Sequence, residues 1–190
     1  MVRYVDVPGA QTRPEGSAID GVGIVAILQK ASGPELLLQK QFRPPINKVV
    51  IEIPAGLVDK GETAGETAVR ELREETGYHG VTSEISPVMF NGLYCVRERH
   101  EEGYAENAIY PDPGFCNTNL NMVHVNVDMS LAENQNLKPE LEENEFIEVF
   151  SLPLKGLYAE CKRLEVEGYA IDARVGTLAE GIEVARRWKL

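Results

Sequence analysis

The stretch from Gly56 to Tyr78 constrains the fold most, because it carries both ends of a helix and an acidic face in one pattern. Thr63 and Glu66 have the spacing of a capping box, which satisfies free backbone N–H groups where a helix begins. Gly77 suits the left-handed turn that commonly follows a helix. At about 100° per residue, four positions would form a stripe facing the core: Gly65, Val69, Leu72 and Thr76.

The other side of this predicted helix is acidic and carries Glu71, Glu74 and Glu75. Glu71 and Glu75 are four residues apart, so their carboxylates are neighbours whose repulsion destabilises a bare helix. A divalent cation that prefers oxygen ligands would offset this repulsion, and Mg²⁺ is typically held by a few carboxylates, waters and substrate phosphates. Arg70 can hold one carboxylate in place. The alternative is a solvated acidic surface, which is what most glutamate-rich helices present.

The spacing of the stretch favours the metal site. It resembles the Nudix box of the Nudix hydrolases at every defined position except for the aromatic Tyr78, where an aliphatic residue is usual. The matching residues are Gly56, Glu62, Arg70, Glu71, Leu72, Glu74, Glu75 and Gly77. In this resemblance Gly56, Glu62, Arg70 and Gly77 have structural roles.

Composition predicts one globular domain, since 190 residues with 43% hydrophobic and 26% charged side chains can bury a full core. A net charge of −11 argues against nonspecific binding to nucleic acid or to anionic membranes. Three cysteines, an odd number without metal-ligand spacing, indicate reduced thiols. No leader or membrane-length apolar run is evident, so we expect a cytoplasmic protein, with the nucleus as an alternative.

The remaining patterns predict strands before and after the acidic helix and two helices near the C-terminus. Residues 1–20 form an irregular lead-in, and residues 21–190 form the domain. Predicted strands cover residues 21–29, 35–42, 48–53, 81–89, 122–129 and 145–150, and predicted helices cover residues 63–76, 154–165 and 172–188. The expected class is α/β, with a mixed sheet in an α-β-α sandwich. This is also the fold that the Nudix resemblance implies.

Segments outside the box resemble the ADP-ribose pyrophosphatase, or ADP-sugar diphosphatase, branch of that family: QFRPP, EIPAGLVD, DPGFCNTN, NEFIEVFSLP and IDARV. The resemblance implies a metal site of Glu71, Glu74, Glu75, Glu145 and the carbonyl of Ala55. Glu71, Glu75 and Glu145 are its catalytic residues, with Glu145 as the base. Substrate would be contacted by Arg43, Leu57, Asp112 and Phe115, and Pro113 would mark the branch.

The reaction that this resemblance implies is Mg²⁺-dependent hydrolysis of ADP-ribose or another ADP-sugar to AMP and a sugar phosphate, with Mn²⁺ as a substitute. A homodimer is also implied. Compared with that branch, residues 92–111 are an insertion, which is either a specificity loop, a disordered loop or a translated intron. Two other functions stay open, namely hydrolysis of another nucleoside diphosphate derivative and a noncatalytic or truncated nucleotide-binding isoform.

Overall fold

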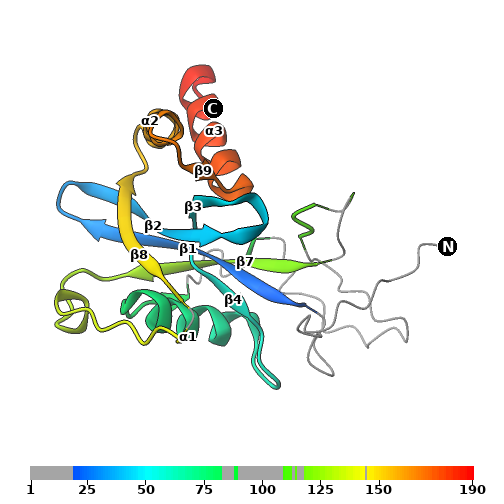
Figure 1. The fold of residues 1–190 in the computed structure, drawn as a ribbon. Coiled ribbons are helices and arrows are strands. Elements are labelled where there is room, and N and C mark those ends of the chain that lie inside the picture. The colour runs from blue at the N-terminus through cyan, green and yellow to red at the C-terminus, as the bar shows by residue number, and fades with distance from the viewer. Residues whose placement is uncertain (1–18, 83–87, 90–108, 113, 115–117, 144) are drawn as a thin grey trace.

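A twisted mixed sheet with helices on both faces organises the molecule (Figure 1). The computed structural model describes residues 19–82, 88–89, 109–112, 114, 118–143 and 145–190. Its helices are α1 (Ala64–Thr76), α2 (Leu157–Val166) and α3 (Ala173–Trp188), with short 3-10 turns at Pro44–Ile46 and Glu133–Gln135. Its strands are β1 (Gly21–Lys30), β2 (Gly33–Arg43), β3 (Lys48–Glu52), β4 (Ala55–Leu57), β5 (Val81–Thr82), β6 (Val88–Met89), β7 (Leu120–Val127), β8 (Ile147–Pro153) and β9 (Ala170–Ile171).

The strand order β5-β7-β1-β2-β3-β9 confirms the predicted mixed sheet. β1 and β2 form the expected antiparallel hairpin, and β1 runs parallel to β7 with Gly21 opposite Leu120. β4 pairs with the first residues of β1, β6 pairs with β7, and β8 pairs with β2. The parallel pairs β1–β7 and β3–β9 join segments far apart in sequence, so β1, β2 and β3 are flanked by strands that come from residue 120 onward.

Each face of the sheet has its own apolar core. Alternate residues of β1, including Ile24 and Leu28, pack with Ala68 and Leu72 of α1. Val25 points to the opposite face, where α2 and α3 cover the sheet and Leu157 is fully buried. Since successive strand side chains alternate between faces, a strand covered on both sides must be apolar at nearly every position. The predicted α-β-α sandwich is therefore confirmed.

The buried stripe of α1 differs from the predicted one. Instead of Gly65 and Val69, the fully or nearly fully buried residues of this helix are Ala64, Thr67, Ala68, Leu72, Glu75 and Thr76. Alanine at positions 64 and 68 leaves room for the helix to approach β1 closely, which turns Glu75 inward. The acidic residues therefore do not all lie opposite the core, as the helical pattern had suggested.

Several sequence expectations lie partly outside the described residues. The expected strand 81–89 is present as two short pieces, β5 and β6, with residues 83–87 outside the description. Most of the 92–111 insertion and most of the 1–20 lead-in also lie outside it. Cys161 is a free, buried thiol, while Cys95 and Cys116 are not described. None of the helices formed by the described residues is long and apolar enough to cross a membrane.

Gly77 provides a test of how α1 ends. Its φ is +75°, and a Cβ added there would lie 2.6 Å from the backbone nitrogen of Lys138. We predict that Gly77→Ala lowers the free energy of unfolding by about 2 to 4 kcal/mol, since left-handed strain adds to a backbone clash. Gly168→Ala is the matched control, because its φ is +101° but an added Cβ meets nothing within 4 Å. It should cost about 1 kcal/mol. If urea denaturation shows that Gly77→Ala and Gly168→Ala lose the same free energy of unfolding, the backbone clash at Gly77 does not contribute.

Candidate active site

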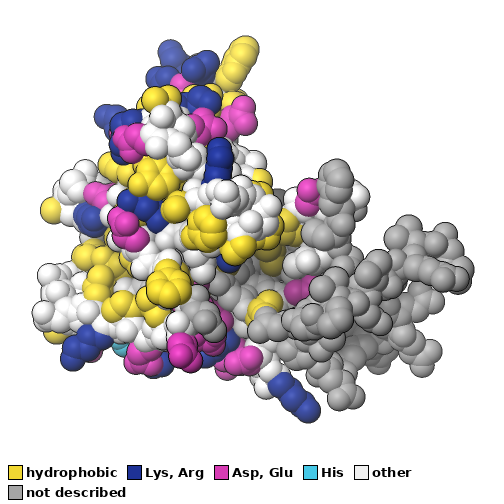
Figure 2. All heavy atoms as spheres, in the orientation of Figure 1, with side chains coloured by type: hydrophobic (Ala, Val, Ile, Leu, Met, Phe, Trp, Pro, Cys, Tyr) yellow, Lys and Arg dark blue, Asp and Glu magenta, His cyan; other side chains and the backbone are white. Residues whose placement is uncertain are grey.

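The acidic helix has the ends that the sequence predicted. Thr63 Oγ1 accepts a hydrogen bond from the Glu66 backbone N–H at 3.3 Å, and Glu66 Oε2 accepts one from the Thr63 N–H at 2.9 Å. At the other end the Gly77 N–H donates to the Arg73 carbonyl at 2.8 Å. These contacts define the two ends of α1. The helix lies below β1 and β4 in Figure 1, and acidic side chains gather along the same lower edge of the molecule in Figure 2.

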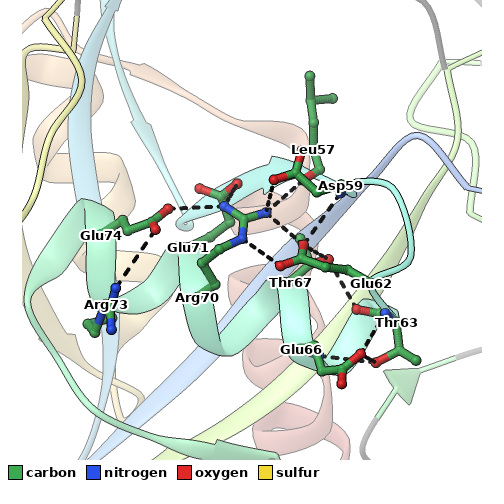
Figure 3. Close-up of polar contacts among 10 residues, drawn as sticks. All are labelled: Leu57, Asp59, Glu62, Thr63, Glu66, Thr67, Arg70, Glu71, Arg73 and Glu74. Carbon is green, nitrogen blue, oxygen red and sulfur yellow. Dashed lines mark hydrogen bonds and ion pairs between the residues drawn. The ribbon is translucent and has the colours of Figure 1, made fainter. Parts of the chain in front are cut away.

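Arg70 connects the loop before α1 to the carboxylates on the helix (Figure 3). Its Nε and Nη2 donate to the two oxygens of Glu62 at 2.8 and 2.9 Å, which is a bidentate pair. Nη1 donates to Glu71 at 2.9 Å and to Glu74 at 3.0 Å, and Nη2 also reaches the Leu57 carbonyl at 3.2 Å. The Arg70 guanidinium holds the pKa of Glu62 at about 2, so Glu62 stays ionised. Arg70 thereby holds the loop and two acidic side chains together.

Gly56 lets the carboxylate of Glu71 lie directly against the backbone of β4. A Cβ at position 56 would be only 1.9 Å from Cδ of Glu71, so every other residue type would displace that side chain. Burial raises the pKa of Glu71, although Arg70 opposes the shift. The negative charges of Glu74 and Glu145 add to the increase. Gly56 is therefore needed for close approach of the acidic helix to the strand.

Glu75 is the most buried of the candidate ligands, with a relative exposure of 4%. Its carboxylate accepts hydrogen bonds from the Ala55 N–H at 3.0 Å and from the Gln39 side-chain amide at 3.4 Å. Burial raises the pKa of Glu75 to about 8. The hydrogen bonds from Ala55 and Gln39 oppose this shift, and the charges of Glu71 and Glu145 add to it. Within the described part of the chain, no lysine or arginine forms an ion pair with Glu75.

These residues fit a divalent cation in chemistry. They offer hard oxygen donors, and the buried charges of Glu71 and Glu75 lack full compensation, which a cation would supply. The described side chains do not form a ready group of three or more metal ligands. The reason is visible in the contacts, because Arg70 draws Glu71 and Glu74 to itself and Glu75 accepts from Ala55. Arg70 contacts Oε1 of Glu71, so a cation would compete with Arg70 for that one oxygen.

Glu145 lies near this cluster without touching it. Its Oε2 accepts a hydrogen bond from the Glu142 N–H at 2.9 Å, within the turn that precedes β8. Its charge nevertheless raises the pKa of both Glu71 and Glu75. It also lines an open groove of about 540 Å³ with Phe42, Phe146 and Tyr169. The role of Glu145 as a base stays a prediction.

The predicted substrate residues are only partly placed. Arg43, at the end of β2, donates from Nη2 and Nε to Glu52 at 2.7 and 3.2 Å. Leu57 is exposed in β4, and Asp112 is exposed on the segment before β7. Phe115 and Pro113 lie outside the described residues. The substrate roles of these residues therefore stay predictions.

Four polar residues of this region were missed by sequence reasoning: Gln39, Glu52, Asp172 and Arg174. Gln39 and Glu52 are buried and opposite each other in the β2–β3 ladder. Asp172 caps α3 and forms a two-pronged ion pair with Arg174 at 2.8 and 3.0 Å. Glu52 is a polar residue directly after the apolar run 49–51, which was an available signal, whereas Gln39 lies among other polar residues of β2 and offered none. Periodicity offered no signal for the contact of α3 with β3.

The buried charge of Glu75 makes a prediction about stability. Because its pKa rises from 4.5 to about 8 on folding, the folded chain binds the proton more tightly, and stability must fall as pH rises between those values. We compare the free energy of unfolding of Glu75→Gln with that of the wild type, both in EDTA. We expect this difference to favour Glu75→Gln at pH 8 by at least about 2 kcal/mol more than at pH 5.

Urea denaturation at both pH values measures this difference. The exposed Glu66→Gln is the matched control on the same helix and should show no such gain, since glutamine also completes a capping box. Mg²⁺ should stabilise the wild type at pH 8 more than it stabilises Glu75→Gln. If Glu75→Gln leaves the pH dependence of the free energy of unfolding unaltered, the raised pKa of Glu75 is contradicted.

Comparison with known proteins identifies the family. A model of the NUDIX domain matches residues 19–171. ADP-ribose pyrophosphatase of Saccharomyces cerevisiae is 46% identical over 181 residues, which cover 94% of this chain and 69% of the yeast protein. ADP-sugar pyrophosphatase of Mus musculus is 34% identical over 86% of this chain and 67% of its own length. ADP-ribose pyrophosphatase of Bacillus subtilis is 34% identical over 70% of this chain and 59% of its own length.

The resemblance inferred from the sequence motifs is thus confirmed. Nudix hydrolases generally use divalent metal ions, which agrees with the carboxylate cluster of α1. The mixed sheet between helices is the α/β fold of these enzymes. Because the family model matches most of its length, this chain belongs to the NUDIX domain family.

Proposed function

We propose that this chain hydrolyses the pyrophosphate bond of ADP-ribose or a related ADP-sugar, releasing AMP and a sugar phosphate. The observation that carries the proposal is the buried, undercompensated carboxylate pair Glu71 and Glu75, which lies against β4. The names of the yeast, mouse and Bacillus relatives support the substrate class. The substrate is therefore a small nucleotide sugar.

The metal would be Mg²⁺, with Mn²⁺ as a substitute, held by Glu71, Glu75 and the Ala55 carbonyl, with Glu74 and Glu145 as further ligands. When bound, such an ion neutralises phosphate charge and polarises phosphoryl oxygens. Arg70 supports this arrangement because it orients Glu71 and Glu74 from one guanidinium. Gly56 supports this arrangement because it has no side chain that would collide with the Glu71 carboxylate.

The chain's own residues perform the other parts of the reaction. Arg43 binds a phosphate of the diphosphate with guanidinium donors that suit a planar or tetrahedral oxyanion. Glu145 accepts the proton from the attacking water, after its carboxylate has turned away from the Glu142 N–H. From the family resemblance, we propose that Leu57, Asp112 and Phe115 contact the substrate.

We also propose a cytoplasmic homodimer. The exposed phenyl rings of Phe42 and Phe146, at 50% and 80% relative exposure, support an association surface at the end of the sheet near β8. Light scattering on the purified protein should give twice the chain mass of 21.0 kDa. A monomeric mass at micromolar concentration would overturn the dimer and leave the proposed hydrolysis intact.

The activity itself is tested by AMP release from ADP-ribose with Mg²⁺. We expect turnover by the wild type and a loss of about 100-fold or more in Glu71→Gln and in Glu75→Gln, because each removes a charge that holds the cation. Glu66→Gln is the matched control, since it changes an exposed glutamate of the same helix and preserves the capping box. It should retain wild-type activity.

Two further substrates, UDP-glucose and a dinucleoside polyphosphate, define the substrate class in the same assay. Faster turnover of either one than of ADP-ribose would replace the ADP-sugar assignment with another nucleotide. If the folded, metal-loaded protein hydrolyses none of the three substrates, the result would instead support a noncatalytic nucleotide-binding module.

A further inference from the structure

We infer that Glu52, a buried carboxylate of β3, is a positioning residue that aims Arg43 at the diphosphate of the substrate. The inference rests on the proposed function, because it takes Arg43 as the phosphate-binding arginine. Glu52 itself would not touch substrate, since its relative exposure is only 3%.

The contact between the two side chains is bidentate and fixes the plane of the guanidinium. Arg43 Nη2 donates to Glu52 Oε1 at 2.7 Å and Arg43 Nε donates to Glu52 Oε2 at 3.2 Å. Among the described residues, Nη1 of Arg43 has no hydrogen-bond partner, so its two N–H donors remain for a ligand. The arginine side chain is 44% exposed while the glutamate side chain is 4% exposed. One side of the guanidinium is thus held inside the protein and the other side faces solvent.

The strand register directs this guanidinium toward the carboxylate cluster. Glu52 lies opposite Gln39 in the β2–β3 ladder, and Arg43 lies four residues farther along β2, opposite Lys48. Arg43 therefore reaches back along the ladder to meet Glu52. Gln39, which is on β2 with Arg43, donates from its side chain to Glu75. Glu52 consequently holds Arg43 on the side of the sheet where the candidate metal ligands lie.

Without Glu52, nothing in the described structure would hold this arginine in one orientation. Pro44 begins a 3-10 turn directly after Arg43, which limits the backbone, but the long side chain keeps its own rotamers. A bidentate carboxylate removes that freedom before the ligand arrives, which improves binding without a new ligand contact. The buried position of Glu52 keeps its own carboxylate away from solvent.

The N-terminus of α3 supports Glu52 from the other direction. The Asp172 N–H donates to the carbonyl of Ile51, the residue before Glu52, at 2.9 Å. Asp172 and Arg174 form their own ion pair, and the charges of both act on Glu52. The four groups sum to zero charge, so Glu52 and Arg43 lie beside a neutral pair. Burial of Glu52 is accordingly compensated mainly by Arg43.

The test compares Glu52→Gln with a matched ion-pair variant at the other end of β2. Glu35 accepts from Lys30 at 2.8 Å and lies at the hairpin end of the same strand. We expect Glu52→Gln to raise the KM for ADP-ribose about tenfold with kcat changed less than threefold, because ground-state and transition-state binding weaken equally. Glu35→Gln should leave both constants unchanged. An unchanged KM in Glu52→Gln would overturn the inference.

A double-mutant cycle separates positioning from a general structural effect. In an Arg43→Ala background, Glu52→Gln should change KM less than twofold, since the residue it positions is already gone. A tenfold effect that persists in that background would refute the positioning role. If Glu52→Gln does not fold, Glu52→Asp, which keeps the charge but shortens the reach, enters the same cycle.

Calorimetric binding of inorganic pyrophosphate in the presence of Mg²⁺ makes the inference independent of the sugar. We expect Glu52→Gln, but not Glu35→Gln, to weaken this binding about tenfold. If the wild type binds pyrophosphate but does not hydrolyse ADP-ribose, the proposed function fails while the role of Glu52 is still decided by these variants. Equal pyrophosphate affinity in the wild type, Glu52→Gln and Arg43→Ala would overturn the role of Glu52.

Discussion

The arrangement of the candidate site depends on the guanidinium of Arg70. It holds Glu62 of the preceding loop by two hydrogen bonds and reaches Glu71, Glu74 and the Leu57 carbonyl with its remaining donors. One side chain therefore fixes the loop, the last residue of β4 and the acidic face of α1 in one geometry. Arginine suits this position better than lysine, since its planar fork can serve several oxygens at once.

Burial of the acidic helix creates the chemistry of the site. The small side chains of Ala64 and Ala68 allow α1 to pack closely on the sheet. Gly56 leaves room for the Glu71 carboxylate beside β4, and Glu75 of the same helix is buried. Buried carboxylates without full compensation are costly to the fold. A bound divalent cation would offset part of this unfavourable free energy, so metal binding would stabilise the folded state. Arg43 of β2 and Glu52 of β3 form a further ion pair on the neighbouring strands.

Much of this could be predicted from local sequence. The capping box at Thr63, the left-handed Gly77 and the grouping of Arg70 with the box glutamates follow from spacing over fewer than two dozen residues. The burial of Glu75 was not predicted, because the helical pattern was read from Gly65 and Val69, whereas Ala64 and Ala68 face the sheet. The contacts of Glu52 with Arg43 and of α3 with β3 depend on strand register and on distant segments, which local periodicity does not specify.

We propose that the buried carboxylate of Glu75 holds the cation. Calorimetric titration of Mg²⁺ into the metal-free protein at pH 7, in two buffers of different ionisation enthalpy, measures both the affinity for the ion and the protons released. Because burial raises the pKa of Glu75 to about 8, binding should release protons from the wild type, and Glu75→Gln should bind the ion weakly and release far fewer. Equal metal affinity and equal proton release in the two proteins would contradict this role of Glu75.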